Sequence, residues 1–246
     1  MSGAGNRFLV TDEPGPAAVD AGLRTLASGE PAADGLLQVL AGGASSDCTM
    51  TVFNADGGRA EACGNGLRCA ALFARERGLA RGDELIVGTD AGPRRVTLLR
   101  EDGAVLSARA EMGSARVRSE TIEVHGARHE VALVDVGNPH CVLFVRALDT
   151  KLLHGLGATL QDHPAFPAGV NLELVVREPE RLVVRVFERG VGETAACGTG
   201  ACAAAAAAVR LHGHAVPVTV DMPGGRLTID LDARGTLWLT GPVRFD

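Results

Sequence analysis

The sequence contains few aromatic residues and no excess of positive charge. Aromatic residues make up 3% of the 246-residue chain, and the formal net charge is -6. A nucleic-acid partner requires clustered cations and often stacking rings. The composition therefore excludes nucleic acid from the expected partners and favours a small zwitterionic or cationic ligand.

The chain also lacks a long apolar segment and a targeting segment. Its longest wholly apolar run, Ala201 to Val209, is much shorter than the roughly 20 residues that span a bilayer. The first residues show no basic stretch followed by an apolar one, which is the pattern of a secretory signal. Six cysteines are too few for a disulfide scaffold of this length. We therefore expect a cytoplasmic protein with reduced thiols and no membrane partner.

No charge block or low-complexity linker interrupts the chain, so any domains should be joined by a short strand crossing. Segments rich in Val, Leu, Ile and Thr predict many strands. Turn pairs between them, such as Asp102-Gly103 and Gly224-Gly225, favour hairpins and mixed or antiparallel sheets. The predicted strands are Arg7–Thr11, Cys48–Asn54, Glu84–Thr89, Arg95–Arg100, Val105–Glu111, Thr121–His125, Glu130–Val136, His140–Val145, Asn171–Arg177, Leu182–Glu188, Val216–Asp221, Arg226–Leu231 and Thr236–Leu239.

One twenty-residue segment occurs twice. Residues 52–71, VFNADGGRAEACGNGLRCAA, align without a gap with residues 186–205, VFERGVGETAACGTGACAAA, and nine of the twenty positions are identical. Similarity at a single long period indicates two related halves rather than a solenoid. Each copy has a cysteine, Cys63 or Cys197, that opens a Gly-rich turn. The chain therefore carries one such thiol in each half.

Helical signals are fewer than strand signals. Two predicted helices start directly after a repeated cysteine and stop at a glycine that suits a left-handed cap. The Ala-rich stretch 203–208 suits a central helix packed closely by surrounding sheet. The predicted helices are Asn65–Arg77 and Thr199–Leu211 after the cysteines, and Pro16–Ser28 and Leu148–Leu160 elsewhere.

The two turns predict a specific chemistry. Their glycines allow close approach of a ligand, and the helix start presents unpaired N–H groups, so an α-carboxylate would bind there. The helix dipole stabilises a thiolate, which predicts lowered pKa values for Cys63 and Cys197. Two thiols that face each other across one carbon could remove a proton from one side and return one on the other. The turns thus predict racemisation without a cofactor.

Several alternatives compete with this hypothesis. A cysteine is often a small buried hydrophobe, and we expect core positions for Cys48, Cys69, Cys141 and Cys202. No metal is expected, because no paired histidines follow the cysteines as in zinc sites. The turns lack the Lys-Ser or Lys-Thr of a phosphate-binding loop. A disulfide between Cys63 and Cys197 would be an inactive form.

The chain resembles the diaminopimelate epimerase family, which comprises cofactor-independent isomerases of lysine and peptidoglycan precursor synthesis. The resemblance covers nearly the whole chain and rests on the order and spacing of several motifs. These motifs are Gly3–Asn6, Phe53–Gly57, Ala62–Gly66, Gly137–His140, Gly169–Asn171, Glu188–Gly190 and Ala196–Gly200.

The resemblance implies a role for each motif residue. Cys63 and Cys197 are implied as the two acid/base residues, and His140 and Glu188 as residues that tune the thiol pKa values. The reacting end of the substrate is implied to bind Gly64, Asn65, Gly198 and Thr199. The rest of the substrate is implied to bind Asn6, Asn54, Asn138, Asn171, Glu188 and Arg189, with Arg189 on the far carboxylate and Glu188 on an amino group.

Each of these side chains also has a structural alternative. Asn6, Asn54 and Asn138 could shape turns. Glu188 and Arg189 could form a solvated pair at a strand end, and His140 could be a hydrogen-bonded structural histidine. Asn171 lies in an apolar strand, where a buried amide needs partners.

Together the repeat and the resemblance predict an α/β (α+β) fold of two pseudo-symmetric halves, each a mostly antiparallel or mixed sheet curled around a central helix. We expect residues 1–112, joined by a C-terminal strand at 236–246, to form the first half and residues 113–235 the second. The expected function is interconversion of LL- and meso-2,6-diaminoheptanedioate. A racemase of another amino acid and a non-catalytic amino-acid-binding protein are the alternatives. The oligomeric state stays open, with a homodimer among the options.

Overall fold

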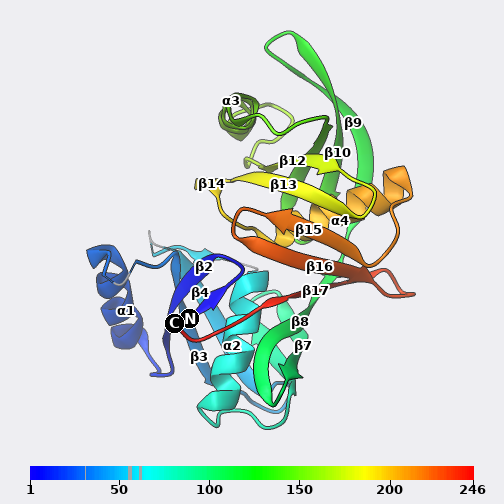
Figure 1. Ribbon diagram of the computed structural model, residues 1–246. Helices are drawn as coiled ribbons and strands as arrows, with labels where there is room; N and C mark the ends of the chain where they lie inside the picture. Colours follow the sequence, from blue (N-terminus) through cyan, green and yellow to red (C-terminus); the bar gives the residue numbers. More distant parts are fainter. Residues whose placement is uncertain (31, 55–56, 61–62) are drawn as a thin grey trace. The chain divides into compact units, whose positions relative to one another are not determined.

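The computed structural model describes residues 1–30, 32–54, 57–60 and 63–246 (Figure 1). Three motif positions named above, Ala55, Asp56 and Ala62, lie outside the described residues. The chain divides into two compact units. Unit 1 comprises Met1–Glu111 and Thr240–Asp246, and unit 2 comprises Met112–Leu239.

Unit 1 is a mixed sheet with one interior helix, α2, and one outer helix, α1. Strands β2 and β3 are parallel, β3 and β4 antiparallel, β4 and β6 parallel, and β6, β7 and β8 antiparallel in turn. Its elements are β1 (Ser2–Gly3), β2 (Asn6–Thr11), α1 (Pro16–Ser28), β3 (Gly35–Ala41), β4 (Cys48–Asn54), β5 (Arg59–Ala60), α2 (Gly64–Glu76), β6 (Glu84–Thr89), β7 (Gly92–Glu101) and β8 (Ala104–Ser114), which runs on into unit 2.

Unit 2 repeats this arrangement around helix α4. Strands β11 and β12 are parallel, β12 and β13 antiparallel, β13 and β15 parallel, and β15 and β16 antiparallel. Its elements are β9 (Arg116–Val124), β10 (Ala127–Asp135), β11 (Pro139–Val145), α3 (Thr150–Gln161), β12 (Asn171–Arg177), β13 (Arg181–Glu188), β14 (Gly192–Thr194), α4 (Gly198–His212), β15 (Val218–Met222), β16 (Gly225–Leu231) and β17 (Thr236–Pro242), whose end belongs to unit 1.

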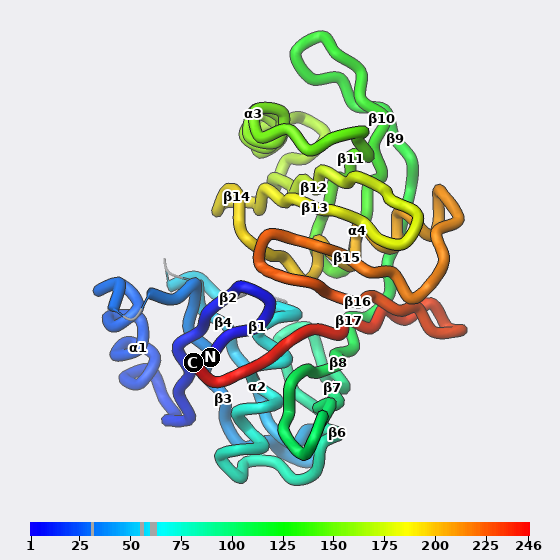
Figure 2. Tube along the Cα trace, in the orientation of Figure 1, coloured from blue at the N-terminus to red at the C-terminus, as the bar shows by residue number. Residues whose placement is uncertain are grey.

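The duplication extends far beyond the twenty repeated residues. The succession of β2, α1, β3, β4, β5, α2, β6 and β7 has the same pairing directions as that of β11, α3, β12, β13, β14, α4, β15 and β16. The path of each unit can be followed in the Cα trace of Figure 2. Equivalent positions in the two units can therefore be assigned from strand register.

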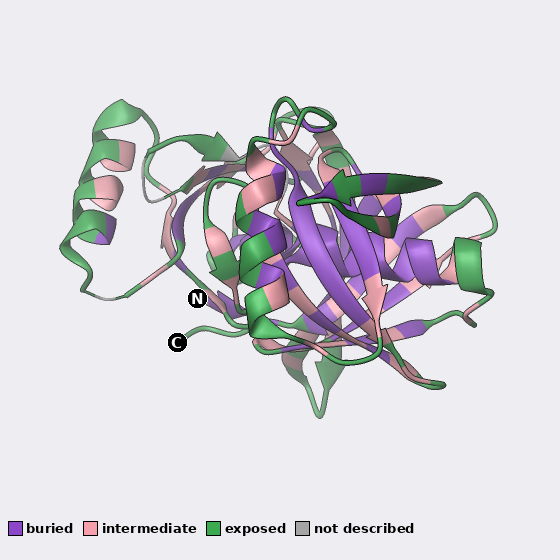
Figure 3. Cartoon of the chain, turned by 90° about the horizontal axis from the view of Figure 1, so that it is seen from above, coloured by how far each residue is buried: buried purple, intermediate pink, exposed green. Residues whose placement is uncertain are grey.

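The interior helix explains how each unit is held together. Residues 198–208 of α4 are all buried, and the helix contacts β9 to β13, β15 and β16. Alanine and glycine side chains allow strands to approach such a helix on several sides, and each buried Leu or Val of those strands contributes about 1.5–3 kcal/mol. In contrast, α1 is mostly exposed, with Leu26 as its buried residue (Figure 3, left). Almost the whole surface of α4 is therefore buried, unlike that of α1.

The α+β fold of two related halves around interior helices is confirmed. All four predicted helices are present, and their ends differ from the predicted ends by no more than two residues. Strand β3 was not predicted, because its sequence GLLQVLA lacks alternation. Leu36, Leu37 and Val39 are all buried, as in a central strand covered on both faces. No helix in the described part of the chain is long and apolar enough to cross a membrane.

The C-terminal segment returns to unit 1. Ser2 and Arg244 form an antiparallel bridge, and the backbone N–H of Val243 donates to the Leu106 carbonyl at 3.2 Å. The Ser2 hydroxyl also donates to Asp246 Oδ1 at 2.7 Å. Residues at the two ends of the chain therefore belong to the same compact unit. The chain passes from unit 1 to unit 2 after Glu111 and returns to unit 1 at Thr240.

Candidate active site

Each repeated cysteine is the N-cap of an interior helix. Cys63 precedes α2 and Cys197 precedes α4, and both have extended backbone conformations. The Gly66 backbone N–H donates to Cys63 Sγ at 3.2 Å. The first N–H groups of a helix lack intrahelical acceptors and favour an anion. Each unit therefore presents a thiol at the start of an interior helix, as the sequence predicted.

The fourth residue of each turn, Gly66 or Gly200, has little room for a side chain. A Cβ on Gly66 would be 3.2 Å from both Cys63 Sγ and Leu37 Cδ2. A Cβ on Gly200 would be 2.7 Å from Glu173 Oε1 and 3.3 Å from Cys197 Cβ. The two turns thus pack on an apolar side chain in unit 1 and on a carboxyl group in unit 2.

We expect Gly200→Ala to destabilise the protein and displace the Cys197 turn. The added methyl group would overlap Glu173 Oε1 in a fully packed interior, which typically costs about 1–3 kcal/mol. Gly155→Ala in α3 is the matched control, because nothing lies within 4 Å of its added Cβ. That substitution should stabilise the protein by about 0.5–1 kcal/mol through helix propensity. Urea unfolding of both variants measures the difference, and equal stabilities would contradict the packing described here.

The unit 1 site contains a hydrogen-bonded group of three side chains. Asn65 is buried, and its amide Nδ2 donates to Asn6 Oδ1. Asn65 Oδ1 accepts from Arg68 Nη2 at 2.8 Å. Arg68 is fully buried and also donates to the Gly64 carbonyl at 3.1 Å. Arg68 therefore fixes the amide of Asn65, which is part of the Cys63 turn.

Asn54 lies apart from this group, at the exposed end of β4. Its backbone N–H donates to the Gly58 carbonyl at 2.8 Å, and its own carbonyl accepts from the Gly57 N–H at 3.0 Å. These bonds hold the backbone of Asn54, whose side chain is exposed at the end of β4.

The unit 2 site contains a longer polar row. His140 Nε2 lies 3.0 Å from Asn138 Oδ1, and Asn138 Nδ2 donates to Thr199 Oγ1 at 3.4 Å. Thr199 Oγ1 lies 3.4 Å from Cys197 Sγ. Four of the residues predicted from the motifs are therefore joined, and the row ends on the thiol.

Glu173 begins this row and was not predicted from the sequence. Its Oε1 lies 2.6 Å from His140 Nδ1, and both side chains are completely inaccessible to solvent. Glu173 stands in the apolar strand segment NLELVV of β12, where an isolated acidic residue is unusual. The same signal would have identified Arg68, a lone cation within the buried part of α2. Each of these side chains anchors one polar group beneath a repeated turn.

The remaining predicted residues of unit 2 lie where β12 starts and β13 ends. Asn171 Oδ1 accepts from the Arg189 backbone N–H at 2.9 Å, and Asn171 Nδ2 donates to the Pro139 carbonyl at 2.9 Å. Arg189 is exposed, and its Nη1 donates to the Ala168 carbonyl at 3.4 Å. The Thr194 hydroxyl donates to Glu188. The buried Asn171 amide thus holds the backbone that presents Glu188 and Arg189.

The prediction of a lowered thiol pKa is wrong for Cys197. Burial of the sulfur, and then the negative charge of Glu188, raise the pKa of Cys197 well above its ordinary value. Burial also raises the pKa of Cys48, Cys69 and Cys141 to about 12. The cysteine at this helix start therefore has a raised pKa, in the direction opposite to the prediction.

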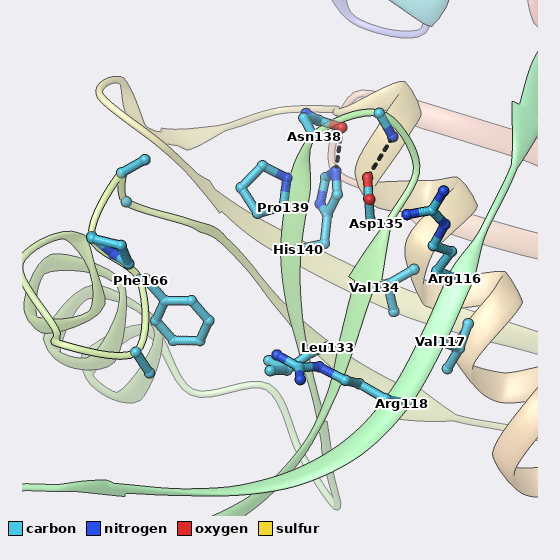
Figure 4. Close-up of a pocket in the computed structure, with 15 residues that line it drawn as sticks. Arg116, Val117, Arg118, Leu133, Val134, Asp135, Asn138, Pro139, His140 and Phe166 are labelled. Carbon is cyan, nitrogen blue, oxygen red and sulfur yellow. Dashed lines mark hydrogen bonds between the residues drawn. The ribbon is translucent and has the colours of Figure 1, made fainter.

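A pocket of about 550 Å³ borders the polar row within unit 2 (Figure 4). Asn138, Pro139 and His140 form one wall, Phe166 lies opposite, and strands β9 and β10 supply the floor. Neither Cys197 nor Thr199 lines this pocket. The described residues contain no cluster of three or more His, Cys, Asp or Glu side chains that could hold a metal ion.

Comparison with known proteins places this geometry in a family. The family described as diaminopimelate epimerase matches residues 1–117 and 132–245. The diaminopimelate epimerase of Pelotomaculum thermopropionicum is 41% identical, over 86% of this chain and 80% of the relative. That of Desulforudis audaxviator is also 41% identical, over 99% and 94%. A probable proline racemase from Agrobacterium radiobacter, 18% identical, shares the fold with a TM-score of 0.73 over 100% of this chain and 92% of its own.

Proposed function

Because the chain belongs to the diaminopimelate epimerase family, we propose that it interconverts LL- and meso-2,6-diaminoheptanedioate. The observation that carries this proposal is the cysteine cap at the start of both interior helices. A family match alone would leave the chemistry open, whereas two thiols beside two helix starts are the parts that an epimerase needs. We place the reaction in the cytoplasm, where thiols stay reduced.

The proposed reaction moves one proton off the α-carbon and another one onto it. A thiolate, from either Cys63 or Cys197, removes the α-proton, and the electron pair of the broken C–H bond delocalises onto the α-carboxylate. The other cysteine, as a thiol, donates its proton to the opposite face of the carbon. The N–H groups at the helix starts stabilise the charge that grows on the carboxylate. The two sulfurs exchange protonation states in each turnover, so their titrations are coupled.

We propose a starting state in which Cys197 is the thiol and therefore the acid, because burial raises its pKa. In this scheme Cys63 is the base, and the N–H of Gly66, 3.2 Å from its sulfur, would stabilise the thiolate. A substrate ammonium that reaches Glu188 would neutralise the charge that raises the pKa of Cys197. Substrate binding would thus ease proton transfer from that thiol.

Recognition of the second amino-acid end follows from side-chain chemistry. Arg189 offers a planar fork that matches a carboxylate, and Glu188 complements an ammonium. Asn6 and Asn138 add neutral amides that are hydrogen-bonded to Asn65 and Thr199 of the two turns. Asn54 adds an exposed amide, and Asn171 contributes by holding the backbone of Arg189. A diamino diacid satisfies both charges, which a substrate with one carboxylate does not.

Incubation with the LL isomer in heavy water tests the proposal. The protein, with both thiols reduced and no pyridoxal phosphate added, should convert the LL isomer to the meso isomer and incorporate deuterium at the inverted α-carbon. Lysine and proline, tested in parallel, should exchange far more slowly. Efficient exchange into either of them, with none into the diamino diacid, would replace this function by racemisation of another amino acid.

A further inference from the structure

The two halves differ at one pair of buried positions behind the turns. In unit 1 Leu37 lies opposite Val52, and in unit 2 Glu173 lies opposite Val186, its equivalent in the repeat. Phe8 is adjacent to Gly35 in the register of β2 and β3, as His140 is adjacent to Asn171 in that of β11 and β12. The apolar pair Phe8 and Leu37 of unit 1 is therefore replaced in unit 2 by His140 and Glu173.

The hydrogen bonds of Asn138 fix the direction of the polar row. Asn138 Nδ2 donates to Thr199, so Asn138 Oδ1 faces His140 Nε2 at 3.0 Å. Since Oδ1 can only accept, Nε2 must carry a proton. Thr199 Oγ1, which already accepts from Asn138, has its own hydrogen available for Cys197 Sγ at 3.4 Å. Each donor in the row therefore points toward the sulfur.

This direction sets the protonation of the pair that starts the row. A second proton lies between His140 Nδ1 and Glu173 Oε1, which are 2.6 Å apart. The pair then has no net charge, whether that proton resides on the imidazole or on the carboxyl group. The opposite amide orientation would leave a net negative charge on two side chains with no solvent access, which burial strongly disfavours. Burial likewise raises the pKa of Glu173.

The placement of Glu173 matches a role in holding His140. Its Oε2 has no hydrogen-bond partner among the described residues, so its polar contacts centre on Oε1 and the imidazole. Gly200, which leaves room for that oxygen, belongs to the Cys197 turn itself. The carboxyl group is thus enclosed between the imidazole and the first turn of α4.

We propose that Glu173 is a positioning residue that holds His140 with its Nε2–H directed at Asn138, so that a continuous row of donors ends on the Cys197 sulfur. The row favours the thiolate form of Cys197, which the reaction needs in one of its two directions. Its effect on the thiol is independent of substrate identity, whereas its effect on turnover rests on the proposed epimerase function.

If Glu173 acted instead as a bare negative charge, its removal would shift the pKa of Cys197 in the opposite direction. A negatively charged carboxylate near Cys197 raises the pKa of that thiol, as Glu188 does and as Glu173 does to a smaller extent when it is charged. Removal of a bare charge would then lower the pKa of Cys197, whereas loss of the directed row would raise it. The titratable groups around the sulfur are Glu173 of β12 and Glu188 of β13, with His140 of β11 behind Glu173.

The test is Glu173→Leu, which installs the residue found at the equivalent position in unit 1. Iodoacetamide alkylation of Cys197, followed by peptide mass spectrometry across a pH series without substrate, gives the pH midpoint of this thiol. We expect the midpoint to rise by about 1–2 units, a 10- to 100-fold loss of thiolate, as for one lost hydrogen bond to a charged group. Cys63 in the same samples is the internal control and should keep its midpoint.

Three further variants make the result specific. Glu173→Gln can donate to His140 Nδ1 as a protonated carboxyl group does, and it should keep the Cys197 midpoint within about 0.3 units, a twofold change in thiolate. Glu188→Gln removes a charge and should lower the midpoint, which verifies that the assay responds to charge. His140→Phe with Glu173→Leu copies the apolar pair of unit 1, so it should fold and raise the midpoint as Glu173→Leu does.

The outcomes separate the proposals. An unchanged or lower Cys197 midpoint in Glu173→Leu, or equal shifts at Cys63 and Cys197, would overturn the positioning role. A raised midpoint in both Leu variants, with rescue by glutamine, supports it. The wild-type heavy-water assay stands apart: if it fails while the alkylation shifts appear, the proposed substrate is wrong and the role of Glu173 stands.

Discussion

Cys63→Ala and Cys197→Ala are each expected to lower kcat/KM for epimerisation at least about 1,000-fold, because each removes one of two proton-transfer groups. The measurement is conversion of the LL isomer to the meso isomer by each variant, with deuterium incorporation followed in parallel. A variant that keeps one thiol could still exchange the α-proton of one isomer without inverting it.

Two other cysteines are matched controls for this experiment. Cys69 lies in α2 and Cys141 in β11, both fully buried, with pKa values raised to about 12 by burial. Their alanine variants remove a core thiol from the same two units and should keep kcat/KM within about threefold while losing some stability. If Cys63→Ala or Cys197→Ala behaved like these controls, the two-thiol mechanism would have to be abandoned.

Arg189→Met is expected to lower kcat/KM for the diamino diacid about 100- to 10,000-fold. A bidentate pair with a carboxylate comprises two charge-assisted hydrogen bonds, each of which contributes about 1.5–3 kcal/mol. Arg189→Lys keeps the charge but loses the planar fork, so its activity should fall between those of the wild type and Arg189→Met. Steady-state kinetics of the three proteins, with KM and kcat resolved, measure the effect.

Arg226→Met is the control for removal of an exposed arginine. Arg226 of β16 pairs with Asp221 of β15, with 2.7 Å between Nε and Oδ1. A surface pair of this kind contributes little to stability. This variant should keep the wild-type kinetics. Equal activity of Arg189→Met and Arg226→Met would show that Arg189 does not hold the far carboxylate, and the substrate would then need no second carboxyl group.

The helices and the two turns were the parts of the fold most open to prediction. A cysteine followed by a Gly-rich turn and an Ala-rich stretch predicts the start of a helix, because N-caps and helix propensities depend on a few neighbouring residues. Most strands were predicted for the same reason. Strand β3 was not, since a strand covered on both faces has no alternation to detect and its burial depends on distant elements.

The candidate site shows the same division. Cys63, Cys197 and the motif asparagines were predicted as site residues from the sequence, whereas Glu173 and Arg68 were not. Both are ionisable residues inside an apolar segment. Strand register brings His140 to Glu173, whereas Arg68 bonds Asn65 of its own helix and the carbonyl of Pro242, which is distant in the sequence. The raised pKa of Cys197 was missed as well, because it results first from burial of the sulfur, and burial is a property of the folded unit.

The sequence by itself determined that the chain is duplicated, that each half presents a cysteine at a helix start, and which family it belongs to. These are local and ordered features, so residue identity and spacing are enough to define them. Only the tertiary structure decided how the halves differ beneath the turns. The register of β12 against β13 places Glu173 where unit 1 has Leu37, and the first turn of α4 encloses it. A buried ionisable side chain is stable only when it has hydrogen-bonding partners, and partners that are distant in the sequence come together only in the folded unit.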